Sequence, residues 1–182
     1  MQPIETLRNK HKDQTAVLIG TGPSIQFLAA SHIQGDFIVT LNFALNAVRL
    51  LRPRVPVYTM QKDGMDVQPQ TPEILLVHKH ESAKENPAYE PAYVFDNLAF
   101  GLAWDKPSCL SVLKILELFG VAHVRCVAFD SVTTGDVRTC RDGSTIQLRP
   151  EAPAYLIQAC WMLEFLKTMP FAVEWITPNA NT

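Results

Sequence analysis

The stretch that decides the fold is TAVLIGTGPS, residues 15–24, where a short apolar run leads directly into two glycines and a proline. An apolar run that ends at a turn signal is typical of a buried strand. Pro23 suits the first turn of a helix, because its missing N–H would have no partner there. We therefore expect a strand over 15–19, a tight turn at Gly20 and a helix over 24–30.

The same alternation continues on both sides of the middle of the chain. Continuous apolar runs predict buried strands. Ser108 is a suitable N-cap and Gly120 a suitable C-terminal stop for a helix, whereas residues 131–149 are polar and rich in turn residues. The expected strands are 36–41, 55–60, 124–129 and 171–176, and the expected helices are 43–51, 108–120 and 152–168. Alternating strands and helices predict an α/β fold: a three-layer Rossmann-like domain with a mostly parallel central sheet flanked by helices. We interpret residues 1–182 as a single nucleotide-binding-type domain.

The segment 61–107 has a different character. Seven of the thirteen prolines lie from Pro53 to Pro107, and only 74–78 and 93–95 resemble strands. Long irregular segments in compact domains often form binding loops. The hypothesis is that 61–107 shapes the ligand site.

Composition excludes several classes of protein. The net charge of −2, with no basic run longer than two residues, argues against nucleic acid as a partner. No apolar run approaches the roughly 20 residues of a transmembrane helix, and the polar start does not resemble a signal peptide. Four cysteines without a CxxC pair predict reduced thiols and a cytoplasmic location. A homo-oligomer stays open.

The glycine turn predicts an anion site. Backbone N–H groups at the start of a helix attract phosphate, so we expect nucleotide contacts from Gly20, Thr21, Gly22, Pro23 and Ser24. A tight turn without ligand is the alternative. Binding of NAD or FAD, as in a Rossmann-like oxidoreductase, is less favoured. The third glycine of that fingerprint is Ile25 here, and the second strand ends in Asn42 where an acidic residue is typical.

Other candidates follow the strands, at the edge where α/β sheets bind ligands. Asn42 is predicted to read ribose or base, or alternatively to cap the next helix. Asp63 and Asp130 are predicted as catalytic carboxylates, one of which serves as a base, or as a pair that holds Mg²⁺. Ser131 and Thr133 add hydroxyls, and Lys106 could pair with a phosphate. His78 and His80 could in principle bind zinc, with a solvent-facing strand end as the alternative.

These landmarks together resemble one group of proteins. The Gly-Pro-Ser turn, the strand ending in Asn42, the helix from Ser108 to Gly120 and the run Ala128-Phe129-Asp130 are similar to the bacterial CMP-sialic-acid-dependent sialyltransferases and the related pterin-diphosphokinase-like proteins. The resemblance implies a Rossmann-like domain that binds a nucleotide or nucleotide-sugar. In it, Pro107, Ser108, Phe129 and Asp130 would complete the nucleotide pocket.

The chain also departs from this group. The glycine that precedes their Asp is Ala128 here, and no histidine follows His123, although the catalytic histidine of the group would lie there. A transfer reaction would then need Asp130, Asp136 or Asp63 as base. The leading expectation is a glycosyltransferase-like enzyme, and the second is a nucleotide-binding module without catalysis.

Overall fold

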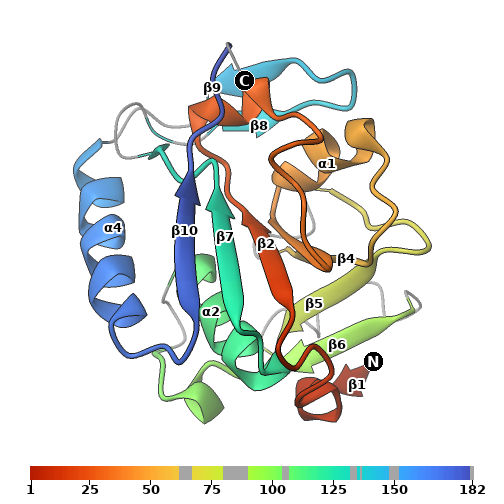
Figure 1. Ribbon diagram of the computed structural model, residues 1–182, viewed down its shortest axis with the longest axis vertical. Coiled ribbons are helices and arrows are strands. Elements are labelled where there is room, and N and C mark those ends of the chain that lie inside the picture. The colour runs from red at the N-terminus through yellow and green to blue at the C-terminus, as the bar shows by residue number, and fades with distance from the viewer. Residues whose placement is uncertain are drawn as a thin grey trace.

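The computed structural model describes residues 1–61, 67–79, 90–103, 107–131, 135, 137–147 and 152–180. An eight-stranded, fully parallel sheet runs through it in the order β1-β6-β5-β4-β3-β2-β7-β10 (Figure 1). The strands are β1 (Gln2–Pro3), β2 (Thr15–Ile19), β3 (Phe37–Leu41), β4 (Val57–Met60), β5 (Ile74–His78), β6 (Ala92–Phe95), β7 (His123–Val127) and β10 (Ala172–Ile176). This confirms the predicted α/β fold.

Helices cover both faces of the sheet. The α-helices are α1 (Ala44–Leu51), α2 (Ser108–Phe119) and α4 (Ala152–Leu166), and the 3₁₀ turns are η1 (Ile4–Leu7), η2 (Pro23–Phe27) and η3 (Leu98–Phe100). In β2, Ala16 and Leu18 join the core under α2, whereas Val17 and Ile19 join the core under α1. Because both faces of each central strand are buried, the strands are continuous apolar runs.

The order in which the chain adds strands to the sheet changes direction at β2. From β2 it proceeds outward through β3, β4, β5 and β6, and then returns through α2 to β7 on the other side of β2. The loops that follow β2 and β7 therefore leave the sheet at a topological switch point, which is where ligands bind in open α/β sheets.

Three local predictions were wrong. The helix expected over 24–30 is the 3₁₀ turn η2, because Leu28 already leaves the helical region with ψ 126°. Helix α2 starts at Ser108, but its N-cap residue is Pro107 and no side chain caps it. The polar stretch expected as turns holds an antiparallel hairpin of β8 (Val137–Thr139) and β9 (Thr145–Gln147).

The described parts of 61–107 add two strands to the sheet. Strands β5 and β6 confirm the strands expected at 74–78 and 93–95, and β6 pairs with β1 near the amino terminus. None of the described helices is both long and apolar enough to cross a membrane.

Candidate functional site

The glycine turn lies against the loop that follows β7. The Gly20 N–H donates to the Val127 carbonyl and the Gly22 N–H donates to the Ala128 carbonyl, both at 2.9 Å. A Cβ on Gly20 would lie 2.6 Å from the Ala128 oxygen, and a Cβ on Gly22 would lie 2.3 Å from Asp130 Oδ1. The glycines are therefore required for the close approach of two backbones at the switch point.

Asp130 occupies the donors of this turn. The Ser24 hydroxyl donates to Asp130 Oδ1 at 2.7 Å, and the Ser24 N–H donates to Oδ2 at 3.1 Å. A carboxylate of the chain itself thus lies at donors that the sequence predicts for phosphate. A phosphate could use the same donors only by displacing Asp130, because two anions repel each other at such short range.

Ala128 holds an unusual backbone conformation in the same loop. Its φ is +57°, in the left-handed region that alanine rarely adopts, and its side chain is fully buried. The Ala128 carbonyl accepts the Gly22 N–H and its own N–H donates to the Ile176 carbonyl at 3.1 Å. Strained positions of this kind cluster at functional sites, so the loop is a candidate site on backbone grounds as well.

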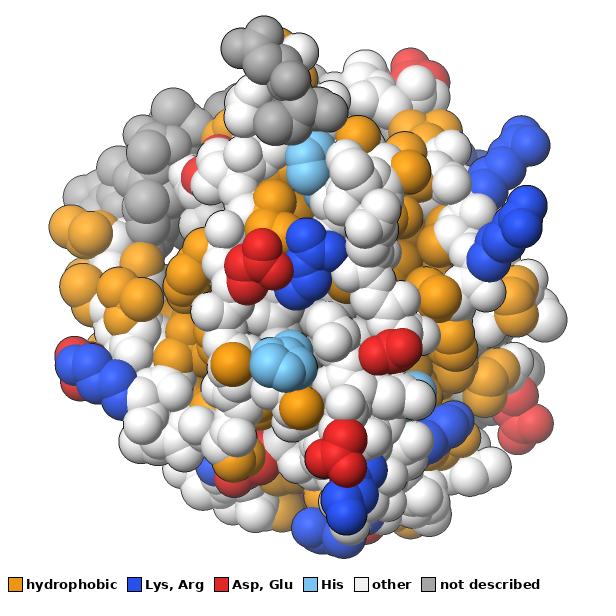
Figure 2. Space-filling view, in the orientation of Figure 1, with side chains coloured by type: hydrophobic (Ala, Val, Ile, Leu, Met, Phe, Trp, Pro, Cys, Tyr) orange, Lys and Arg blue, Asp and Glu red, His pale blue; other side chains and the backbone are white. Residues whose placement is uncertain are grey.

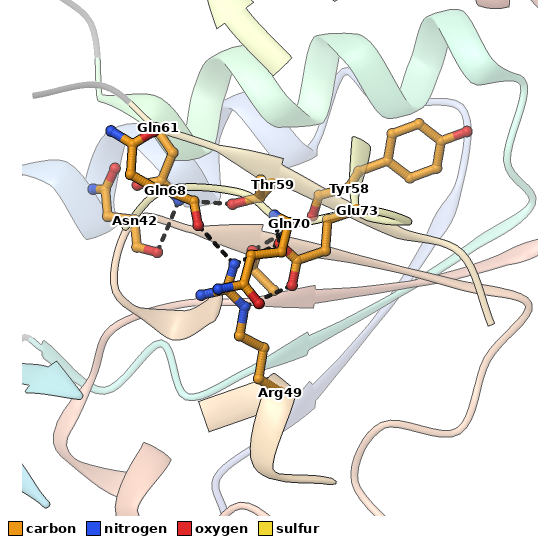
Figure 3. A network of polar contacts seen from close by, with 9 residues as sticks. Asn42, Arg49, Tyr58, Thr59, Gln61, Gln68, Gln70 and Glu73 are labelled. Carbon is orange, nitrogen blue, oxygen red and sulfur yellow. Dashed lines mark hydrogen bonds and ion pairs between the residues drawn. The ribbon is translucent and has the colours of Figure 1, made fainter. Parts of the chain in front are cut away.

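Asn42 directly follows the neighbouring strand β3 and also has a left-handed backbone, with φ +46°. Asparagine tolerates this conformation better than most residues. The Gln61 amide donates to the Asn42 carbonyl at 3.1 Å and to the Thr59 hydroxyl at 2.7 Å (Figure 3). The N-cap of α1 is Phe43, without a side-chain bond, so helix capping by Asn42 is wrong as an explanation of this residue.

The hairpin β8–β9 covers the carboxyl edge beside α1. Its Val137 N–H donates to the Thr21 carbonyl at 2.8 Å, and the Asn46 amide donates to the Thr139 carbonyl at 2.8 Å. The Arg138 guanidinium lies 4.8 Å from the centre of the Phe43 ring. A sequence signal for this hairpin was present, since Asp-Gly at 142–143 between two short β-prone segments favours a hairpin turn.

Several buried polar atoms near this edge have no hydrogen-bond partner. They are Asn46 Oδ1, Gln61 Oε1 and Thr139 Oγ1. Each such atom costs free energy, because it gives up water without a replacement. The same edge of the sheet thus combines unpartnered polar atoms with an unfavourable backbone at Ala128.

A bidentate ion pair fixes the segment after β4. Arg49 of α1 donates to both Glu73 oxygens at 2.6 Å and to the Gln68 carbonyl at 2.7 Å (Figure 3). The Gln70 N–H donates to the same carboxylate at 2.6 Å. This network holds residues 67–73 against α1 and involves no residue of the glycine turn.

Trp175 is a site candidate that the sequence did not single out. It lies near the carboxyl end of β10, is 47% exposed, and contacts the Phe129 ring edge-to-face at 6.1 Å between centroids. The Phe129 ring also lies about 3.1 Å from where a Gly20 Cβ would be. An exposed aromatic side chain on a β-strand gave no sequence signal of its own, since strands are rich in aromatics.

The structure brings together only part of the predicted site. The glycine turn meets Phe129 and Asp130 at the switch point, Ser131 follows Asp130 in the same loop, and Asn42 follows the next strand. Pro107 and Ser108 lie at the start of α2, on the opposite face from α1. Asp63, Lys106 and Thr133 lie outside the described residues.

The predicted metal ligands lie only partly within the described residues. No group of three or more His, Cys, Asp or Glu side chains there could hold a metal ion. His78 is buried and its Nε2 accepts the Asn97 N–H at 3.4 Å, so it does not face solvent; His80 and Glu81 lie outside the described residues. A hollow of about 240 Å³ lies beside Met1 and the start of β6, away from the switch point.

Neither protein-family models nor curated protein sequences match the chain.

Proposed function

We propose that the chain binds a nucleotide or nucleotide-sugar at the switch point between β2 and β7. The observation that carries this proposal is the junction of the glycine turn with the Ala128–Asp130 loop at the carboxyl edge. There, two glycines let the turn lie directly against the Ala128–Asp130 loop, a buried alanine holds a strained backbone, and Ser24 orients a carboxylate.

The chemistry of the junction favours recognition of hydroxyl and amino groups. Asp130 is fixed by both donors of Ser24, and an oriented carboxylate accepts hydrogen bonds from ribose or sugar hydroxyls. Trp175 and Phe129 offer an aromatic surface next to it, on which a base can stack. A phosphate beside Asp130 would need a cation such as Mg²⁺ to offset the two negative charges.

The reaction proposed for this ligand is transfer of its sugar, as the resemblance implies. Among the described residues, Asp130 is the one proposed to accept a proton from the attacking hydroxyl. The alternative is a binding module without catalysis. Release of free nucleotide from a nucleotide-sugar, abolished by Asp130→Asn, supports the transfer reaction; binding without release supports the module.

The test is a thermal-shift panel of nucleosides, nucleotides and nucleotide-sugars, each with and without Mg²⁺, beside NAD and FAD. A ligand at about 100 times its Kd stabilises a protein by roughly 2.7 kcal/mol, which corresponds to a Tm increase of about 5–10 °C at this size. Stabilisation by cytidine or uridine compounds that Asp130→Ala removes is the expected result. Stabilisation only by NAD or FAD would contradict the proposal.

Two further variants locate the ligand. Trp175→Ala is expected to weaken binding and to remove a fluorescence change on ligand addition, because Trp175 is proposed to touch the base. Trp161→Phe is the matched control, because Trp161 is equally exposed but lies on α4. Equal effects of the two variants would place the ligand elsewhere.

A further inference from the structure

Helix α4 has a side on which large apolar residues remain exposed to solvent. Met162 is buried, and Phe165 and Leu166 pack against the core beneath the helix. The other side exposes a set of large apolar residues: Leu156 (58%), Ile157 (52%), Trp161 (45%) and Leu163 (52%). A surface helix normally shows polar residues to water, and a helix that is apolar all round is normally buried.

The exposed residues form one continuous stripe, which we call the α4 stripe: Leu156, Ile157, Cys160, Trp161 and Leu163. With 3.6 residues per turn, these positions fall on one side of the helix. Cys160, also exposed, lies in the middle of the stripe. Figure 2 shows hydrophobic side chains gathered at the margin of the molecule where Figure 1 places α4.

The area of the stripe matches what a protein interface needs. The solvent-accessible area of its exposed apolar side chains is roughly 450 Å². A standard interface buries about 800 Å² on each partner, of which roughly 56–65% is apolar. The stripe therefore supplies the apolar part of one standard interface. Other exposed large apolar residues, such as Leu50, Leu98 and Ile146, lie on separate elements.

We propose that α4 pairs with α4 of a second copy of this chain, antiparallel about a two-fold axis near Cys160. Two-fold dimers are the commonest oligomers, and they require a patch that complements itself. Antiparallel pairing about residue 160 brings Leu163 to the level of Leu156 and Ile157 of the partner subunit, so that apolar side chains meet. The small Cys160 side chain lies at the axis, where the two helices approach most closely.

Charge does not oppose this pairing. Glu164 and Lys167 lie on the same side of the helix as the stripe, toward its carboxyl end, and form an ion pair with each other at 2.6 Å, so their charges offset each other. The chain as a whole carries a net charge of only −2, so two copies repel each other weakly. The dimer is independent of the proposed nucleotide site, because the stripe contains none of the residues of that site.

The test measures the oligomeric state by sedimentation equilibrium from low to high micromolar concentration, without added nucleotide. The wild-type chain is expected to be a dimer. Leu163→Lys is expected to weaken the dimer by about 100-fold, since two copies of the side chain lose their burial. Leu50→Lys is the matched control, because Leu50 is 51% exposed near the end of α1, and it should leave the dimer unchanged.

Oxidation tests the two-fold arrangement without disturbing the fold. Diamide is expected to link two chains through Cys160, giving a reducible dimer on a denaturing gel that Cys160→Ser removes and Cys140→Ser retains. This arm stays informative if Leu163→Lys fails to fold, as judged by circular dichroism. A wild-type chain that is monomeric throughout the range, a dimer that both lysine variants weaken equally, or a dimer without the Cys160 link would each overturn the proposal.

Discussion

The two edges of the parallel sheet differ in whether their buried polar groups have hydrogen-bond partners. At the amino edge, the Tyr58 hydroxyl and His11 Nε2 are 2.8 Å apart, and His11 Nδ1 lies 2.7 Å from Gln14 Oε1. The His11 ring stacks on Phe37 with centroids 3.9 Å apart. Both ring nitrogens of this buried histidine thus have partners, as expected where the structure is optimised for stability.

The carboxyl edge is less well satisfied. Gln61 Oε1, Asn46 Oδ1 and Thr139 Oγ1 are buried without a partner, and Ala128 has a left-handed backbone. Left-handed residues near the amino edge are Asn9 and Asp13, whose types tolerate this conformation, and Arg52, which ends α1 as its C-cap. The edge proposed as the ligand site therefore gives up stability, which is the usual relation between function and stability.

The largest expected effect tests the packing of the glycine turn. Gly22→Ala should destabilise the chain by about 3 kcal/mol, because its Cβ would lie 2.3 Å from Asp130 Oδ1 and 2.7 Å from the Asp130 nitrogen. Gly101→Ala is the control: its φ is +72°, but its Cβ would meet nothing within 4 Å, so only about 1 kcal/mol of backbone strain is expected. Urea unfolding measures both, and equal losses would contradict the close approach.

The amino edge is tested by Tyr58→Phe. Removal of the hydroxyl leaves the buried His11 Nε2 without its partner, so a loss of about 1.5 kcal/mol is expected in urea unfolding. Tyr93→Phe, a half-buried tyrosine of β6 outside the pair with His11, should change the free energy of unfolding by less. An unaffected Tyr58→Phe chain would show that the amino edge does not depend on this pair.

Thr139→Val is expected to have the opposite sign. The Thr139 hydroxyl is buried without a partner, and valine has nearly the same shape, so the variant should gain about 1 kcal/mol. Thr59→Val is the matched control. The Thr59 hydroxyl accepts the Gln61 amide at 2.7 Å, and its loss should destabilise the chain. A stabilised Thr59→Val chain would remove the contrast between partnered and unpartnered hydroxyls.

The pH dependence of stability tests the buried histidine. Burial lowers the pKa of His11 below its ordinary value of 6.5, although the hydrogen bond with Gln14 opposes this effect. Below about pH 6.5 the unfolded chain therefore binds a proton that the folded chain does not, and stability falls as the pH decreases. Urea midpoints at pH 7.5 and 5.5 measure the loss. His11→Gln should reduce it and the exposed His123→Gln should not.

The smallest expected effect concerns Ala128. Ala128→Gly relieves the left-handed strain, but it removes a fully buried methyl group and raises the conformational entropy of the unfolded chain. These effects oppose each other, so the free energy of unfolding should change by less than about 0.5 kcal/mol. Ala47→Gly in α1 has no strain to relieve and should cost at least about 1 kcal/mol. A similar cost for both variants would mean that the Ala128 backbone is not strained.

Much of the fold could be predicted because hydrophobic runs report burial directly. The strands expected over 15–19 and 74–78 and the helix stop at Gly120 agree with the structure, and the other predicted strands differ by one or two residues at an end. The hairpin β8–β9 was not predicted, although Asp-Gly at 142–143 is a turn signal, because its strands are three residues long and rich in polar side chains. Short strands stabilised by contacts with distant segments leave little local pattern.

The site was harder to predict than the fold. The glycine turn and Asp130 were recognised separately, but their direct contact joins residues 106 positions apart, which no local pattern reveals. Burial also depends on neighbours: the helix at 152–168 was expected, whereas the exposed apolar side of α4 follows from where the helix packs.

The sequence by itself determined the alternation of strands and helices, the buried strands and the glycine turn, because these depend on local sterics and on the apolar character of short runs. Only the tertiary structure decided that Asp130 occupies the turn, that Ala128 is strained and that α4 keeps an exposed apolar stripe. Those features arise from the order of strands in the sheet, which brings together segments far apart in the chain.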